Sequence, residues 1–238
     1  MLAVGFTSVL GIAPLFAQVT IYTDTLADLV ANHGSLTIGD KTFSNFSALG
    51  SGFTVYNPAT IQVTAIAGPA GIDYLQFVGN ITLLGPPAGS ADLQLGYTVT
   101  AGAGLISMID QEYTGSAHNG DLTIDEIASS TGAPTAHSDL SAGFGITDVS
   151  DPNSFFAPNG TFDIGEDDLL SISPPQSTLQ VTKDISVDVT GVSPLDKVTI
   201  SVIMQSFHQV PEPSAMLLVS LGSGLLVFLR TRSKATRD

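Results

Sequence analysis

Apolar residues alternate with polar or small residues through most of the region between residues 18 and 209. The pattern is clearest in five segments rich in Val, Ile and Thr: residues 61–67, 72–78, 91–101, 185–190 and 197–207. Successive side chains of a strand point to opposite faces, so a period of two is typical of strands with one buried face. Stretches such as GPPAGS and SPPQS separate the segments and indicate turns. The pattern predicts a mainly β fold, either a β-sandwich or a jelly roll.

One segment near the start of this region follows a helical period instead. In TDTLADLVANHG, Leu26 and Leu29 fall on the same face of a helix. Thr23 or Asp24 is suited to cap the N-terminus of this helix, and Gly34 is suited to end it. We therefore expect one short N-terminal helix beside the strands.

The last part of the chain departs from the strand pattern. Ala215 to Leu229 is uncharged and mostly apolar, and as a helix it would be roughly 22 Å long. This is short of the roughly 30 Å hydrocarbon core of a membrane. Four basic residues follow: Arg230, Arg232, Lys234 and Arg237. An apolar run that ends in such a block is typical of a stop-transfer segment. We predict a single C-terminal transmembrane helix with its basic end in the cytoplasm, and a buried C-terminal helix is the alternative.

A short motif precedes this run, and the whole tail resembles that of a known family. The motif is Val210-Pro211-Glu212-Pro213-Ser214. Motif, apolar run and basic end, in this order, resemble the PEP-CTERM sorting tail of exported bacterial proteins, and similar tails are also named the C-terminal domain of ice-binding proteins. The resemblance implies recognition in the inner membrane by an exosortase, a transpeptidase-like enzyme that cuts near Pro-Glu-Pro. It also implies a final place at the cell surface or in an extracellular matrix, in association with exopolysaccharide.

Export also requires a signal at the other end of the chain. Residues 2–16 form an apolar run, and a small residue, Ala17, follows it. No basic residue precedes the run, and Leu15 stands where signal peptides prefer a small residue. We interpret residues 1–17 as a signal peptide, residues 18–209 as one exported domain and residues 210–238 as the sorting and anchoring segment.

A less specific resemblance concerns the region before the tail, which we call the body of the chain. Ile38-Gly39-Asp40-Lys41, followed by Phe43 and Phe46, is similar to a group of uncharacterised PEP-CTERM proteins. It implies no activity. We interpret Asp40 and Lys41 as a turn and the two phenylalanines as core residues.

Charge separates the body from the tail. Between residues 18 and 213 there are three lysines, no arginine and 21 acidic residues, a net charge of −18. Such a surface repels the phosphate backbone, so nucleic-acid binding is excluded as a function class. It suits a protein outside the cytoplasm or one that binds cations.

No catalytic motif is evident. The chain has no cysteine, and its four histidines lack the spacing of a metal site. G-x-S-x-G, P-loop and dinucleotide-binding patterns are absent from the sequence. Carboxylates are numerous, and a glycosidase-like pair cannot be named without geometry. Aromatic residues make up 7% of the chain and tryptophan is absent, so platforms for stacking sugars are scarce.

The densest acidic segment is DIGEDD, residues 163–168. We interpret it either as a solvated loop or as a weak calcium site formed by Asp163, Glu166, Asp167 and Asp168. Crowded carboxylates cost stability unless water or a cation screens them, and calcium prefers such oxygen ligands. In the calcium interpretation the backbone turns sharply at Gly165, so that carboxylates on both sides converge. Apart from this weak calcium, we expect no cofactor.

Two functions remain at this point. The first is an exported, surface-directed structural or adhesive protein with an exosortase-type sorting signal. The alternative is an extracellular carbohydrate-active or other hydrolytic enzyme. The enzyme requires a cleft that holds close carboxylates flanked by aromatic rings, which an adhesive protein does not need.

Overall fold

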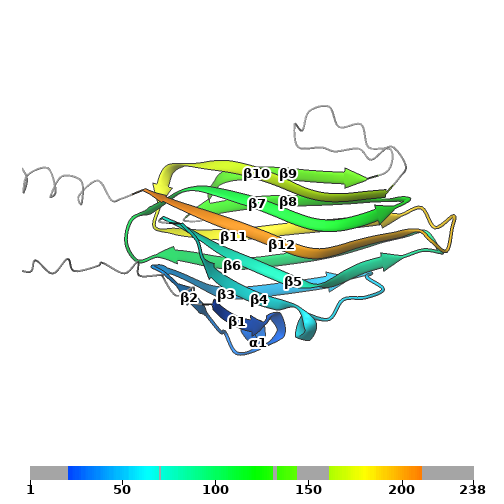
Figure 1. Ribbon diagram of the computed structural model, residues 1–238, viewed down its shortest axis with the longest axis horizontal. Coiled ribbons are helices and arrows are strands. Elements are labelled where there is room, and N and C mark those ends of the chain that lie inside the picture. The colour runs from blue at the N-terminus through cyan, green and yellow to red at the C-terminus, as the bar shows by residue number, and fades with distance from the viewer. Residues whose placement is uncertain (1–20, 70, 131–132, 144–160, 211–238) are drawn as a thin grey trace, which may run out of the picture.

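The domain consists of two antiparallel β-sheets packed face to face (Figure 1). This computed structural model describes residues 21–69, 71–130, 133–143 and 161–210. The first sheet contains, in spatial order, β1 (Ile21–Thr25), β4 (Gln62–Ala67), β5 (Ile72–Leu84), β12 (Lys197–Val210), β7 (Leu105–His118) and β10 (Thr161–Gln176). The second sheet contains β2 (Leu36–Ile38), β3 (Lys41–Ser51), β6 (Gly89–Ala101), β11 (Thr178–Val189), β8 (Gly120–Ser130) and β9 (Ala133–Gly143).

The last eight strands are paired in a nested order. β8 pairs with β9, β7 with β10, β6 with β11, and β5 with β12, and these pairs alternate between the two sheets. This is the order of one long antiparallel hairpin folded over itself, which is the connectivity of a jelly roll. Contacts of β12 with β7 and of β11 with β8 then complete each sheet. The predicted mainly β fold is confirmed, and the strand order is that of the jelly roll.

The N-terminal part extends both sheets. β4 and β1 continue the first sheet beyond β5, and β3 and β2 continue the second sheet beyond β6. A short 3-10 helix, η1 (Pro58–Thr60), precedes β4, and the α-helix α1 (Leu26–Ala31) lies between β1 and β2.

The predicted short helix is confirmed, but its predicted caps are wrong. Strand β1 continues to Thr25, and this residue is the N-cap, because its hydroxyl accepts the backbone N–H of Asp28 at 3.1 Å. The C-cap is Asn32 rather than Gly34. Leu26 and Leu29 are both fully buried, as the helical period predicts.

The core lies between the sheets and is organised around three aromatic rings. Phe43 from β3 and Tyr97 from β6 belong to the second sheet, and Phe207 from β12 belongs to the first. The ring centroids of Phe43 and Phe207 are 5.3 Å apart, and those of Tyr97 and Phe207 are 6.3 Å apart. Aromatic pairs at such distances add to the stabilisation that burial provides. Phe43 and Phe46 are core residues, as predicted.

The β11–β12 loop packs against the β5–β6 loop at one end of the domain (right in Figure 1). The Asp196 carboxylate accepts the backbone N–H groups of Val192 and Ser193 at 2.7 and 3.0 Å, which fixes the β11–β12 loop. A Cβ atom at Gly191 would lie 1.8 Å from the backbone nitrogen of Ala88 in the β5–β6 loop, so only glycine fits there. Val192 is held outward, with 81% of its surface exposed.

Candidate functional site

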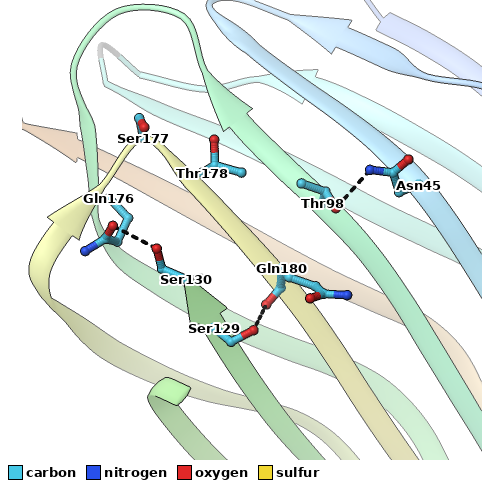
Figure 2. A pocket seen from close by; sticks show the side chains of 8 residues that line it. All are labelled: Asn45, Thr98, Ser129, Ser130, Gln176, Ser177, Thr178 and Gln180. Carbon is cyan, nitrogen blue, oxygen red and sulfur yellow. Dashed lines mark hydrogen bonds between the residues drawn. The ribbon is translucent and has the colours of Figure 1, made fainter. Parts of the chain in front are cut away.

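An open groove with a volume of about 640 Å³ lies on the outer face of the second sheet (Figure 2). It crosses β3, β6, β11 and β8 close to the point where β10 passes into β11. Its lining consists of hydroxyl and amide side chains alone: Asn45, Thr98, Ser129, Ser130, Gln176, Ser177, Thr178 and Gln180.

Strand alternation directs these side chains outward. In β11, Leu179 and Val181 are buried in the core, so Thr178 before them and Gln180 between them face the groove. Asn45 reaches the groove because β3 has a bulge between Ser44 and Ser47, where Asn45 adopts a φ of 54°. Asparagine tolerates this left-handed backbone better than most residues.

Hydrogen bonds hold several lining residues in place. The Asn45 amide donates to the Thr98 hydroxyl at 3.3 Å. The Ser130 hydroxyl donates to the side-chain oxygen of Gln176 at 2.9 Å, and the Gln176 amide donates to the carbonyl of Pro174 at 2.9 Å. The groove is a set of neutral donors and acceptors without a charge or an aromatic ring. It can bind a neutral, hydroxyl-rich ligand, and each net hydrogen bond would contribute about 0.5–1.5 kcal/mol.

A group of neighbouring carboxylates lies elsewhere on the same outer face. Asp184 of β11 stands directly opposite Asp125 of β8 and shares a hydrogen bond with Asp92 of β6. This hydrogen bond, burial, and the negative charges of Asp92 and Asp125 all raise the pKa of Asp184. Glycosidases hold their two carboxyl groups about 5 Å or more apart, so that a sugar bond fits between them. A hydrogen-bonded pair leaves no such space.

The crowding at Asp184 makes stability depend on pH. The folded protein holds the carboxyl proton of Asp184 more tightly than the unfolded chain does. This binding favours folding below the usual Asp pKa of about 4, and the contribution to stability is lost as pH rises through the raised pKa of Asp184. Asp184→Asn should therefore stabilise the fold at pH 7 by about 0.2–1 kcal/mol, the range for cross-strand charge pairs. Urea unfolding at pH 7 and pH 3 measures the effect, which should disappear at pH 3.

The matched control is Ser186→Asn, which changes the same face of β11 without removing a charge. It should show no gain that depends on pH. A stabilisation by Asp184→Asn that is equal at both pH values would contradict the assignment.

Asp40 lies in the turn between β2 and β3, as predicted, but Lys41 is the first residue of β3 and is completely buried between the sheets. Its ammonium contacts the Asp73 carboxylate of β5 at 2.9 Å and the Asp40 carboxylate at 3.4 Å. Burial by itself would raise the pKa of Asp40, but hydrogen bonds from Gln209 and the Ala103 N–H, with the charge of Lys41, lower it overall. This network joins the two sheets at one end of the domain.

The same network holds the end of β12 in place. The Gln209 side chain donates to Asp40 at 2.8 Å and to the carbonyl of Ala103 at 3.1 Å, and its backbone N–H donates to the carbonyl of Gly71 at 2.9 Å. Val210, the first residue of the predicted sorting motif, is the last residue of β12. The motif therefore begins where the described domain stops.

The other predicted tail residues lie outside the described part of the chain: Pro211, Glu212, Pro213, Ser214, Arg230, Arg232, Lys234 and Arg237. The same holds for the predicted signal peptide, residues 1–17. Neither helix of the described segments is long and apolar enough to cross a membrane.

The predicted acidic loop is not a loop. Residues 161–171 form an unbroken antiparallel pairing with β7, in which Gly165 stands opposite Thr114. The sharp turn expected at Gly165 is therefore wrong, because pairing with β7 keeps this backbone extended. The side chains of Asp163, Glu166, Asp167 and Asp168 lie outside the described part of the structure, so calcium binding by them stays a prediction. Among the side chains that are described, no three His, Asp or Glu residues are placed to hold a metal ion.

Comparison with known proteins adds remote structural likenesses. No protein-family model and no curated protein sequence matches the chain. TmCBM61, solved in complex with β-1,4-galactotriose, is 9% identical, with a TM-score of 0.32 over 68% of this chain and 87% of its own. The enzymatically active domain of bacteriophage CBA120 tailspike protein 4 is 10% identical, with a TM-score of 0.30 over 67% of this chain and 19% of its own.

A third likeness is to the arabinose-bound α-L-arabinofuranosidase MgGH51. It is 10% identical, with a TM-score of 0.24 over 66% of this chain and 22% of its own. Likenesses at this level do not transfer a ligand or an activity, because function depends on the residues of a site rather than on the fold.

Proposed function

We propose that the chain is an exported, surface-directed structural or adhesive protein that binds polysaccharide without cleaving it. Export and sorting are supported by the resemblance of residues 210–238 to PEP-CTERM tails, which carry motif, apolar run and basic end in the same order. In this account an exosortase-like enzyme processes the tail in the inner membrane, and the domain then resides at the cell surface or in the matrix.

The observation that supports polysaccharide binding is the neutral lining of the groove. Hydroxyl and amide groups from four neighbouring strands face one open surface, which suits the repeated hydroxyl groups of a sugar chain. The body carries a net charge of −18, so it would repel an acidic polysaccharide. The ligand we propose is accordingly a neutral exopolysaccharide, held weakly by several hydrogen bonds.

Groove variants test this assignment. Gln180→Ala combined with Thr98→Val should weaken binding to a neutral polysaccharide by about 5- to 160-fold, the equivalent of two lost hydrogen bonds. Affinity electrophoresis of the purified full chain in gels containing neutral or acidic polysaccharides measures the retardation.

The matched control removes an exposed pair of hydroxyl groups from the outer face of the first sheet. Thr23→Val with Thr64→Val deletes a 3.1 Å contact between β1 and β4 and should leave the retardation unchanged. Equal losses in both double variants, or no retardation of the native chain by any neutral polysaccharide, would contradict the proposal.

A further inference from the structure

Four long polar side chains meet in the middle of the core. Lys183 of β11 and Glu126 of β8 come from the second sheet, where they stand directly opposite each other. Gln111 of β7 and Gln205 of β12 come from the first sheet. All four are buried, with at most 2% of any residue exposed. Each occupies an inward position of its strand, where the neighbouring inward residues are apolar.

The contacts place an amine against both a carboxamide and a carboxylate. The Lys183 Nζ donates to the Gln111 Oε1 at 2.7 Å and forms an ion pair with the Glu126 Oε2. The Gln205 Nε2 donates to the Glu126 Oε1 at 3.2 Å. Tyr97 lies close enough that burial and the negative charge of Glu126 together raise its pKa far above the usual range.

These three groups have complementary reactivities. An amine is a nucleophile once it has lost its proton, and an ionised carboxylate in contact with it is suited to take that proton. The 2.7 Å contact of the Lys183 Nζ with the Gln111 Oε1 holds the amine beside the carboxamide carbon that it would attack. Fixed positions in a closed core replace a bimolecular encounter, and such proximity accelerates reactions by large factors.

We propose that Lys183 and Gln111 become joined by an intramolecular isopeptide bond, with Glu126 as the group that moves the protons. Glu126 takes a proton from Nζ, and the neutral amine attacks the Cδ of Gln111. The Cδ–Nε2 bond then breaks after a proton passes from Nζ to Nε2. The products are one secondary amide and one ammonia, which leaves as ammonium with the proton that Glu126 held.

Gln111 is the electrophile in this scheme because Glu126 is a carboxylate. An ionised carboxylate resists attack by an amine, whereas a neutral carboxamide does not carry the repelling charge. Lys41, the other buried lysine, provides an internal comparison. Its hydrogen-bond partners are the carboxylates of Asp40 and Asp73, whose side chains are 28% and 11% exposed at one end of the sandwich. We expect Lys41 to keep a free amine.

The bond would tie the two sheets together through their centres. It would connect β7 of the first sheet with β11 of the second, across 72 residues of the chain. The β8–β9 hairpin and β10 lie within the closed segment. This role is independent of what the groove binds.

Peptide mapping of the native full chain tests the proposal. After denaturation and digestion at acidic residues, fragment spectra should contain a branched peptide that joins Lys183 to Gln111 and lacks one ammonia. Acetylation of the denatured chain should modify Lys41 and Lys197 and leave Lys183 unmodified. This branched peptide should account for most of the Lys183 recovered.

Glu126→Gln supplies the matched variant, since it keeps the side-chain shape and removes the proton acceptor. The branched peptide should be lost in this variant and retained in Lys197→Arg, whose side chain is at the surface. Unbranched peptides with a free Lys183 amine in the native chain would overturn the proposal and leave an ion pair only. A branched peptide that joins Lys183 to Glu126 with loss of one water would overturn it as well.

Discussion

Replacing Lys183 by methionine should lower the free energy of unfolding more than any other single change to a lysine of the β-sandwich domain. In a chain that carries the proposed link, the substitution removes a covalent closure across 72 residues, which costs about 4 kcal/mol because the unfolded chain is no longer restricted. In a chain with only the ion pair, the substitution leaves the Glu126 carboxylate in the core without its cation, which costs about 3–5 kcal/mol. Either loss is a large part of the total stability of a typical domain.

A second variant distinguishes the covalent link from the ion pair. Lys183→Met combined with Glu126→Leu removes both charged side chains, and apolar replacement of a whole buried pair is often close to neutral. The double variant should therefore recover most of the loss if the native chain holds only the ion pair, and little of it if the native chain holds the covalent link.

Guanidinium unfolding of the purified full chain provides the measurement, with Lys197→Met as the surface control. A surface substitution changes stability by about 0.5 kcal/mol or less. We call the buried group of Lys183, Glu126, Gln111 and Gln205 the central polar cluster. If Lys183→Met destabilises the domain no more than Lys197→Met does, this cluster has no structural role.

The strands with clean alternation could be predicted from the sequence because local pattern and burial agree there. Residues 91–101 lie in β6, and residues 185–189 of the predicted segment 185–190 lie in β11. These are the central strands of the second sheet, where each inward position is buried. The choice between a sandwich and a jelly roll could not be made, because it depends on which distant strands pair. β5 and β12, for example, are separated by six intervening strands.

The central polar cluster was missed although the sequence contains a signal for it. Lys183 interrupts an inward series in which Val181 and Ile185 are its neighbours, and Glu126 interrupts the series of Ile124 and Ala128. Burying a charged residue at an inward position costs free energy unless a partner that pairs with the charge lies opposite it. Register alone brings these two together, and register is a property of the folded sheet.

The groove and the acidic segment of β10 also could not be predicted from the sequence. Asn45, Thr98 and Gln180 are unremarkable polar residues until β3, β6 and β11 lie side by side. DIGEDD has the composition of a loop, but the partner strand β7 supplies hydrogen bonds to its backbone and keeps it extended. In both cases a tertiary contact decides what the local sequence leaves open.

The second large effect concerns the tail. Pro211→Ala with Pro213→Ala should leave export intact but block removal of residues after the Pro-Glu-Pro motif, since the processing enzyme would no longer recognise its site. Export can be followed separately because the chain has no cysteine. Val192→Cys places one thiol at a position that is 81% exposed, and a membrane-impermeant maleimide should label it in intact spheroplasts with either tail.

Pro58→Ala is the matched control, because it removes a proline from η1, far from the tail in sequence. Its tail should be processed as in the native chain. Labelling of Val192→Cys only after spheroplasts are lysed would place the domain in the cytoplasm and contradict export.

Mass spectrometry of the C-terminal residue tests the central claim, that this is an exported domain sorted by its tail. For protein purified from whole-cell extracts, we predict that the native chain and Pro58→Ala end near Glu212, and that the double proline variant retains residues through Asp238. A native chain and a double proline variant that end at the same residue would contradict sorting through this motif.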